Sequence, residues 1–188
     1  RRGGGAAAAP APRSATSTSR PPATRPGGRP SRGPATTWGI GRRAMLSDCH
    51  AQAGLKAHKN ETFDIVFHPV SNCYVEDVQH VFKKVYRVLK NGGVFLAGQN
   101  NEINYIVDDE EKEIVWRMPF NPLKNKTAKE YMIKEKSGMQ FSHNMMEQIG
   151  GQLKAGFTLL DIYEDTNGFG RLHELNIKTY IATKSTKL

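Results

Sequence analysis

Phe63-Asp-Ile-Val-Phe-His-Pro-Val-Ser-Asn72 decides the fold of this chain, together with the segment from Val78 to Ala97. The apolar run at 63–67 is typical of a buried parallel strand, and Pro69 ends it. A helical segment and a second short apolar run, Val94 to Ala97, come next. Strand, helix and strand in this order predict a parallel crossover unit, whose first strand ends at a ligand crevice.

The segment after Asp77 has the spacing of a helix with one buried face. Glu76 and Asp77 are expected in its first turn and Arg87 and Lys90 in its last, which suits the helix dipole. Asn91-Gly-Gly93 predicts a left-handed stop. The stripe itself falls at the i, i+3, i+4, i+7, i+8 and i+11 positions: Val78, Val81, Phe82, Val85, Tyr86 and Leu89.

Further elements are predicted on both sides of this unit. Residues 38–61 contain no clear strand, only a weak helical pattern at 44–57. A polar insertion covers 99–138, and strands are expected at 157–163 and 177–183. Between the insertion and these strands, we expect a helix over 142–155, capped by Ser142. Its inward residues are expected to be Met145, Met146, Ile149 and Leu153.

The net charge of +9 belongs to the N-terminal region. Residues 1–43 contain nine Arg and no acidic residue, so the remaining 18 basic and 18 acidic residues balance. Residues 1–37 lack Leu, Ile, Val and Phe, which predicts a disordered tail over 1–43 and a domain over 44–188. The tail is open to three interpretations: an incidental segment, an organelle transit peptide, or a nucleic-acid-binding arm.

Composition also narrows the class of protein. Two cysteines, Cys49 and Cys73, provide neither a disulfide framework nor a four-ligand zinc site, so we expect a reducing, cytoplasmic setting and no metal. No apolar run approaches the roughly 18 residues that a membrane span needs.

Residues 62–184 resemble the C-terminal half of a class I S-adenosylmethionine-dependent methyltransferase. The resemblance rests on Phe63–Phe67, on Val85-Tyr-Arg-Val-Leu-Lys-Asn-Gly-Gly-Val-Phe95, and on the unit around Ala155-Gly-Phe157. It covers 123 of the 188 residues. It implies an α/β, Rossmann-like sheet of which this chain holds about the fourth to seventh strands, the last two forming an antiparallel hairpin.

The same resemblance implies S-adenosylmethionine as cofactor, held by a Gly-rich turn after the first strand and an acid after the second. Gly39-Ile-Gly41 has no strand before it, and neither has Asp48, so no motif in the sequence matches this grip.

Candidate site residues follow from the position of strand ends. His68, Ser71, Asn72 and Tyr74 follow one strand, and Asn100 follows the next, so they are candidates for binding a methyl acceptor. His68 and Pro69 are also candidates for contacting the cofactor. The alternative is that these polar side chains form hydrogen bonds with backbone groups of their own loops. No catalytic residue is identified.

Four functions remain open at this point. The first is methyl transfer to a small-molecule acceptor. The second is a truncated, non-catalytic fragment that dimerises through its exposed sheet edge or needs the missing half. A dinucleotide-dependent oxidoreductase is disfavoured, because no Gly-x-Gly-x-x-Gly follows a strand. Nucleic-acid binding through the basic tail is the last.

Overall fold

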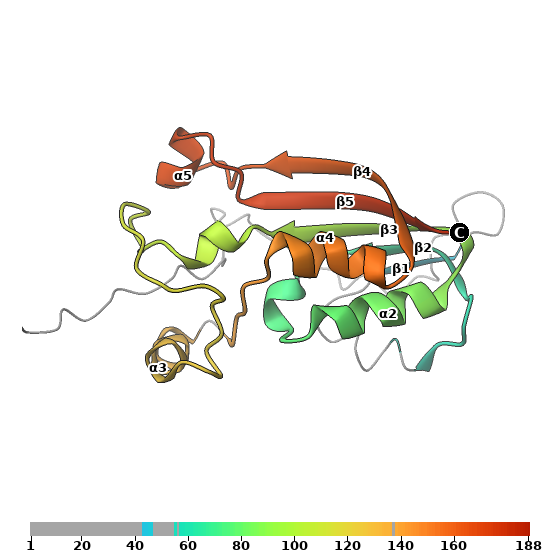
Figure 1. Ribbon diagram of the computed structural model, residues 1–188, viewed down its shortest axis with the longest axis horizontal. Coiled ribbons are helices and arrows are strands. Elements are labelled where there is room, and N and C mark those ends of the chain that lie inside the picture. Colours follow the sequence, from blue (N-terminus) through green and yellow to red (C-terminus); the bar gives the residue numbers. More distant parts are fainter. Residues whose placement is uncertain (1–42, 47–54, 56, 137) are drawn as a thin grey trace, which may run out of the picture.

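The computed structural model describes residues 43–46, 55, 57–136 and 138–188. The disorder predicted for the tail concerns residues outside these ranges except Arg43, and Gly39-Ile-Gly41 and Asp48 also lie outside them. Within them, a mixed five-stranded sheet carries two helices on one face (Figure 1). This agrees with the α/β architecture expected from the sequence.

The strands are hydrogen-bonded in the order β1-β2-β3-β5-β4. β1, β2 and β3 are parallel, whereas β5 is antiparallel to both of its neighbours. The last two strands therefore form the expected antiparallel hairpin, with the final strand inserted beside β3. The bounds are β1 (Ala44–Leu46), β2 (Phe63–His68), β3 (Leu89–Asn100), β4 (Phe157–Asp165) and β5 (Tyr180–Lys187).

β1 corrects the prediction for residues 44–46, where a weak helical pattern was seen and no strand. Ala44 pairs with Ile65, and the backbone of Arg43 exchanges hydrogen bonds with Asp64: the Arg43 N–H donates to Oδ2 (2.8 Å) and the Arg43 carbonyl accepts from the Asp64 N–H (2.9 Å). Three residues are too few to show an alternating pattern. Pairing with β2 therefore decides their conformation.

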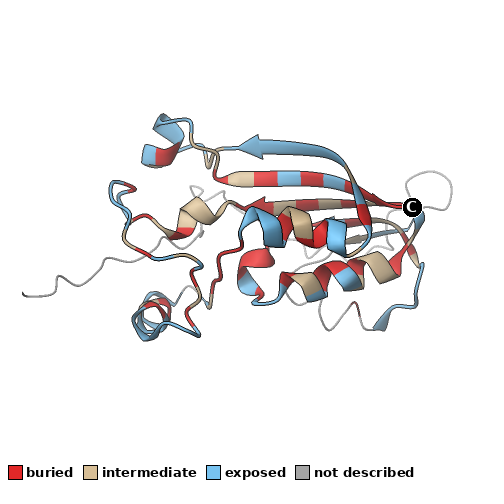
Figure 2. Cartoon of the chain, viewed as in Figure 1, coloured by how far each residue is buried: buried red, intermediate tan, exposed pale blue. Residues whose placement is uncertain are grey.

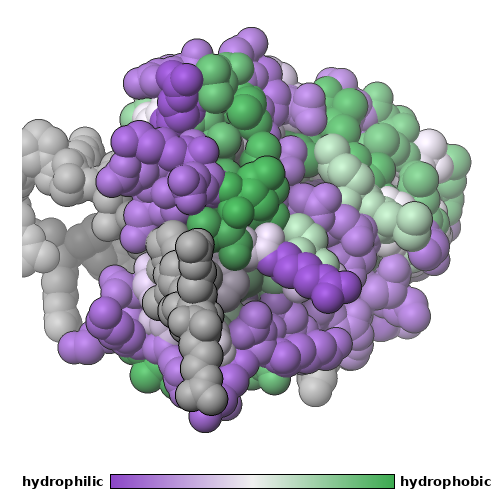
Figure 3. All heavy atoms as spheres, turned by 60° about the vertical axis from the view of Figure 1, so that its left-hand side comes forward, coloured by the Kyte–Doolittle hydropathy of each residue, from purple (hydrophilic) through white to green (hydrophobic). Residues whose placement is uncertain are grey.

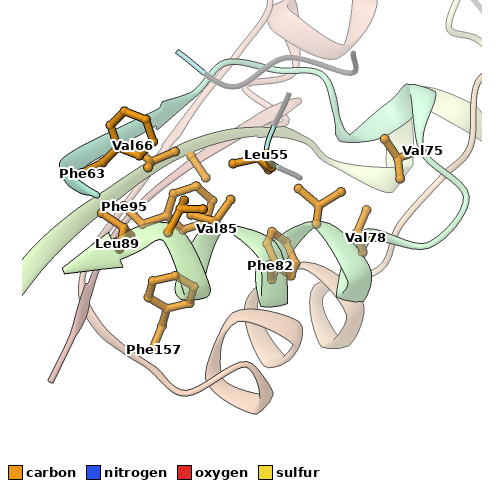
Figure 4. Packing of buried hydrophobic residues seen from close by; sticks show 13 residues of the cluster. Leu55, Phe63, Val66, Val75, Val78, Phe82, Val85, Leu89, Phe95 and Phe157 are labelled. Carbon is orange, nitrogen blue, oxygen red and sulfur yellow. The ribbon is translucent and has the colours of Figure 1, made fainter. Parts of the chain in front are cut away.

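Helix α2 (Val78–Val88) forms as the sequence predicts, with Asp77 as its N-cap. Its buried residues pack against the sheet, where Phe95 contacts both the Phe82 ring (centroids 6.1 Å apart) and the Phe157 ring (5.2 Å). Figure 4 shows α2 side chains meeting side chains from β2, β3 and β4 in one apolar cluster. This cluster is the main core of the described chain.

The stop predicted at Asn91-Gly-Gly93 is not where the helix ends. Leu89 already has extended dihedrals (φ −75°, ψ 140°), so α2 passes directly into β3. Gly92 has φ +75°, and a side chain on Gly93 would lie 2.7 Å from the Lys90 carbonyl oxygen. The two glycines thus form an irregular step within β3, where the register with β2 shifts.

Helix α4 (Met145–Lys154) begins at Asn144 rather than Ser142, and its buried face differs from the prediction. Met145, Met146 and Leu153 are exposed, and the buried residues are Gln148, Gly151 and Gln152. The face of β5 below the helix is polar, which explains the reversal.

Polar contacts and a small residue hold α4 in this position. Gln152 Oε1 accepts hydrogen bonds from Ser185 Oγ (2.7 Å) and Thr183 Oγ1 (3.3 Å). Gly151 has no side chain to keep the helix away from α2, because an added Cβ would lie 3.0 Å from the Phe82 ring.

Gly156, which connects α4 to β4, occupies a position where a side chain does not fit. Its φ is +104°, and a Cβ there would lie 2.9 Å from the Tyr86 ring, which is held against Phe157 and below the Lys187 ammonium. We expect Gly156→Ala to lower the free energy of unfolding by about 2 kcal/mol, measured by urea denaturation.

Gly150→Ala is the matched control, because Gly150 lies inside α4 and its Cβ would meet only Met146, at 3.7 Å. It is expected to raise stability by about 0.5–1 kcal/mol. Equal effects of the two substitutions would contradict the steric argument.

The segment between β3 and α4 forms a second cluster, beyond the ends of the parallel strands (Figure 1). It contains the 3-10 helix η2 (Glu102–Tyr105) and helix α3 (Lys126–Glu135), neither of which was predicted. A short helix α5 (Gly170–Glu174) precedes β5, and the 3-10 helix η1 (Asn72–Tyr74) follows β2. The cluster consists of Cys73, Tyr105, Trp116, Phe120, Ala128 and Met132. No helix within the described residues has the length and apolarity needed to cross a membrane.

Candidate functional site

The candidate site lies at the carboxyl ends of β2 and β3. His68 of β2 pairs with Ala97 of β3, so the residues just beyond these positions share one edge of the sheet. Figure 3 brings this end of the molecule forward and shows hydrophobic atoms gathered between hydrophilic ones. In open α/β sheets, ligands bind at this edge.

Three of the predicted residues form one hydrogen-bonded group after β2. His68, Ser71 and Asn72 are all buried. The Ser71 hydroxyl donates to the Pro69 carbonyl (3.0 Å), so Ser71 Oγ acts as an acceptor toward His68 Nε2 (3.3 Å). His68 Nε2–H then donates mainly to Asn72 Oδ1 (2.7 Å). This arrangement fixes the imidazole tautomer and turns the Asn72 amide nitrogen away from the group.

Asn100, at the end of β3, is oriented in a similar way. Its Nδ2 donates to the Tyr105 hydroxyl (3.0 Å), which in turn donates to Gln140 Oε1 (3.5 Å). Asn100, Tyr105 and Gln140 are buried. The Asn100 side-chain oxygen therefore points away from the phenol.

Burial raises the pKa of Tyr105 well above its usual value of 10, and nearby Cys73 raises it further. The phenol is thus neutral in the folded protein throughout the physiological pH range. It can hold Asn100 and Gln140 as a hydrogen-bond partner, but it does not provide a charge.

This shift predicts a loss of stability at alkaline pH. The unfolded chain releases the Tyr105 proton near pH 10, whereas the folded chain retains it. The folded state therefore binds more protons above pH 10, and this residue alone should lower the free energy of unfolding by up to about 1.4 kcal/mol per pH unit there.

Urea denaturation between pH 7 and 12 tests this prediction by comparing the chain with Tyr105→Phe. The variant should lose stability less steeply above pH 10. Between pH 7 and 9 the two curves should be parallel, which is the internal control. Identical slopes above pH 10 would exclude this role for Tyr105.

Sequence reasoning missed two residues that hold the site together. His143 is buried, and its Nε2 lies 3.1 Å from the Asn72 carbonyl and 2.7 Å from the Val75 carbonyl. Gln148 Nε2 donates to the carbonyls of Asn100 (2.8 Å) and His143 (2.7 Å). The start of α4 thereby ties together the segments that follow β2 and β3.

The sequence contains a signal for the start of the helix that carries Gln148. Asn144 and Glu147 form a capping box, in which each side chain accepts a hydrogen bond from the other residue's backbone N–H. A helix beginning at Met145 places Gln148, Gly151 and Gln152 on one face. The capping box therefore locates the start of α4, whereas the burial of this polar face follows from the packing of the helix.

Buried side-chain polar atoms without a hydrogen-bond partner gather at this end of the molecule. Thr179 is beside the site, because the Asn101 N–H donates to its carbonyl (2.9 Å), and Trp116 packs on Phe120 in the second cluster. Within the described residues, these unpartnered atoms are Asn72 Nδ2, Gln99 Oε1, Asn100 Oδ1, Trp116 Nε1 and Thr179 Oγ1.

The structure thus brings together His68, Ser71 and Asn72, and places Asn100 at the same edge. Tyr74 differs from them in being 37% exposed, and Pro69 is only partly buried. Among the described residues, no group of three or more His, Cys, Asp or Glu side chains could hold a metal ion. His68, Ser71, Asn72 and Asn100 thus place buried polar side chains at one edge of the sheet.

Comparison with known proteins gives three findings. A family model described as a methyltransferase domain matches residues 41–97. An uncharacterized methyltransferase, YbaJ of Bacillus subtilis (strain 168), is 35% identical over 143 residues, covering 71% of this chain and 54% of the relative. This chain therefore spans about half the length of that relative.

A solved S-adenosylmethionine-dependent methyltransferase from Mesorhizobium loti has a similar fold. The TM-score is 0.52 at 18% identity, covering 69% of this chain and 64% of that protein.

Proposed function

The chain belongs to the class I S-adenosylmethionine-dependent methyltransferases, and we propose that it forms the acceptor side of a methyl-transfer site. The methyl acceptor would be a small molecule. The cofactor of this family is S-adenosylmethionine, which supplies an electrophilic sulfonium methyl group when bound.

One observation supports this proposal above the others. His68, at the end of β2, orients the amide of Asn72 and leaves its buried Nδ2 without a partner. An unpartnered buried donor costs about 1–3 kcal/mol unless a ligand or water satisfies it. A donor held this way, at the edge where ligands of such sheets bind, suits a ligand-binding role.

The described residues fit only part of a cofactor site. Those that precede β2 contain no glycine, and their single acidic residue, Glu61, pairs with Lys187 at the amino end of β2 (3.2 Å). They cannot supply the glycine-rich turn and the acid expected from the family resemblance. In our proposal, His68 contacts the cofactor and orients Asn72, and Asn72 and Asn100 hold the acceptor.

Titration calorimetry of S-adenosylhomocysteine into the folded chain tests this function. We expect binding with Kd about 10–100 µM, because only part of the site is present. His68→Ala should weaken binding at least about tenfold, because His68 is the buried polar residue that we propose contacts the cofactor. His80→Ala is the control, because His80 is exposed on α2 and should leave binding unchanged. A folded chain that binds no S-adenosylhomocysteine would contradict the proposal.

A second candidate is a non-catalytic fragment that pairs with another copy of itself. The sheet face opposite α2 and α4 holds an apolar groove of about 450 Å³, and β4 is exposed over most of its length (Figure 2). Phe67, Ile162 and Tyr163, which line this groove, are 44–63% exposed. Asp161 of β4 and Lys184 of β5 also line the groove, and they are opposite each other in the two strands. In a twofold-related dimer, Asp161 of each copy could therefore face Lys184 of the other.

Sedimentation velocity at increasing protein concentration distinguishes the two candidates. Self-association through the groove should be lost in Phe67→Lys and retained in Leu175→Lys, because Leu175 is 53% exposed but does not line the groove. A chain that is monomeric at all concentrations would rule out the second candidate.

A further inference from the structure

The unpartnered atoms at the site form a specific recognition pattern. Asn72 Nδ2 is a donor, and Asn100 Oδ1 is an acceptor. Neither orientation is arbitrary, because the His68 imidazole fixes the Asn72 amide and the Tyr105 hydroxyl fixes the Asn100 amide.

Side chains also connect the two segments that carry these amides. Tyr105 hydrogen-bonds with Asn100 and with the side chain of Cys73, the residue after Asn72. His143 and Gln148 join the backbones of the same two segments. Asn72 and Asn100 are thus parts of one rigid assembly rather than of two independent loops.

Within the described residues, no Asp, Glu, Lys or Arg side chain hydrogen-bonds with Asn72 or Asn100. The side chains in hydrogen-bond contact with Asn72 and Asn100, within the described residues, belong to His68, His143, Tyr105 and Gln148. Burying a carboxylate or an ammonium group without a counter-charge costs several kcal/mol. A neutral ligand with one acceptor and one donor would satisfy both amides at no such cost.

We propose that the methyl acceptor binds as an uncharged molecule, which accepts a hydrogen bond from Asn72 Nδ2 and donates one to Asn100 Oδ1. Amides, phenols and neutral azoles have this chemistry, whereas carboxylates and alkylammonium ions do not. This inference rests on the proposed function, since it specifies the substrate class of the same site.

Side-chain amide signals in ¹H–¹⁵N NMR spectra of the whole chain test the inference without any substitution. The probes are acetamide and its charged isostere acetate, each titrated to 100 mM at pH 7. Acetamide should displace the Asn72 and Asn100 signals saturably, with Kd roughly 1–50 mM, and acetate should displace them at least tenfold less. The Asn104 signal is the internal control, because its Nδ2 already donates to the Asn101 and Thr179 carbonyls.

Equal displacement by acetate would overturn the inference, and so would unmoved Asn72 and Asn100 signals, which would mean that buried water satisfies both amides. Calorimetry with S-adenosylhomocysteine is a separate measurement. Displacement by acetamide in a chain that fails that titration would refute the methyl-transfer proposal while supporting neutral-ligand recognition.

Discussion

Phe95→Ala is expected to lower the free energy of unfolding by about 3–5 kcal/mol, which would leave this chain largely unfolded at 37 °C. Phe95 is fully buried at the centre of β3, where its ring contacts Phe82, Phe157 and His68. Removing the ring opens a cavity between the sheet and both helices. Because His68 is one of these contacts, the candidate site should be lost together with the core.

Phe67→Ala is the matched control for this substitution. Phe67 is in β2, opposite Leu96, but it faces away from α2 and is 47% exposed. Its removal should cost less than about 1 kcal/mol. Urea denaturation followed by circular dichroism measures both variants, and comparable losses would mean that the face opposite the helices is also packed.

Gln148→Met is expected to cost about 3 kcal/mol, although methionine has a similar size and the same number of side-chain torsions. The Nε2 of Gln148 is the donor to two buried carbonyls, those of Asn100 and His143. Methionine has no donor, so both carbonyls would lose this hydrogen bond, at about 1–3 kcal/mol each. Hydrogen exchange should also accelerate in the segments after β2 and β3, since Gln148 connects them.

The same substitution at Gln79 is the control. Gln79 Nε2 donates to one carbonyl, that of Gly151 (3.0 Å), in a partly buried position. Gln79→Met should therefore cost about 1 kcal/mol and leave hydrogen exchange at the site unchanged. If Gln148→Met were no more destabilising than Gln79→Met, the role assigned to the start of α4 would be wrong.

The sequence predicted those parts of the fold in which local pattern and tertiary packing agree. α2 shows its buried stripe because one face meets the apolar side of the sheet, and Phe63 and Val66 of β2 are buried in the same cluster. α4 misled the prediction because its buried face is polar: Gln148 and Gln152 satisfy backbone carbonyls and β5 hydroxyls, while Met145 and Met146 are exposed. Hydrophobic periodicity carries no information about such a face.

The sequence likewise predicted some residues of the candidate site and not others. His68, Ser71, Asn72 and Asn100 were identified because residues that follow parallel strands meet at one edge, which is a property of topology that order in the sequence reveals. His143 and Gln148 could not be connected to them, since 71 residues separate His143 from Asn72 and 48 separate Gln148 from Asn100.

By itself, therefore, the sequence determined that β2, α2 and β3 form a parallel crossover unit, and it determined the edge at which these two strands end, because hydrophobic period and turn residues are local properties of the chain. Only the tertiary structure decided which buried amides are held by partners and which remain open, because hydrogen bonds between distant segments depend on packing.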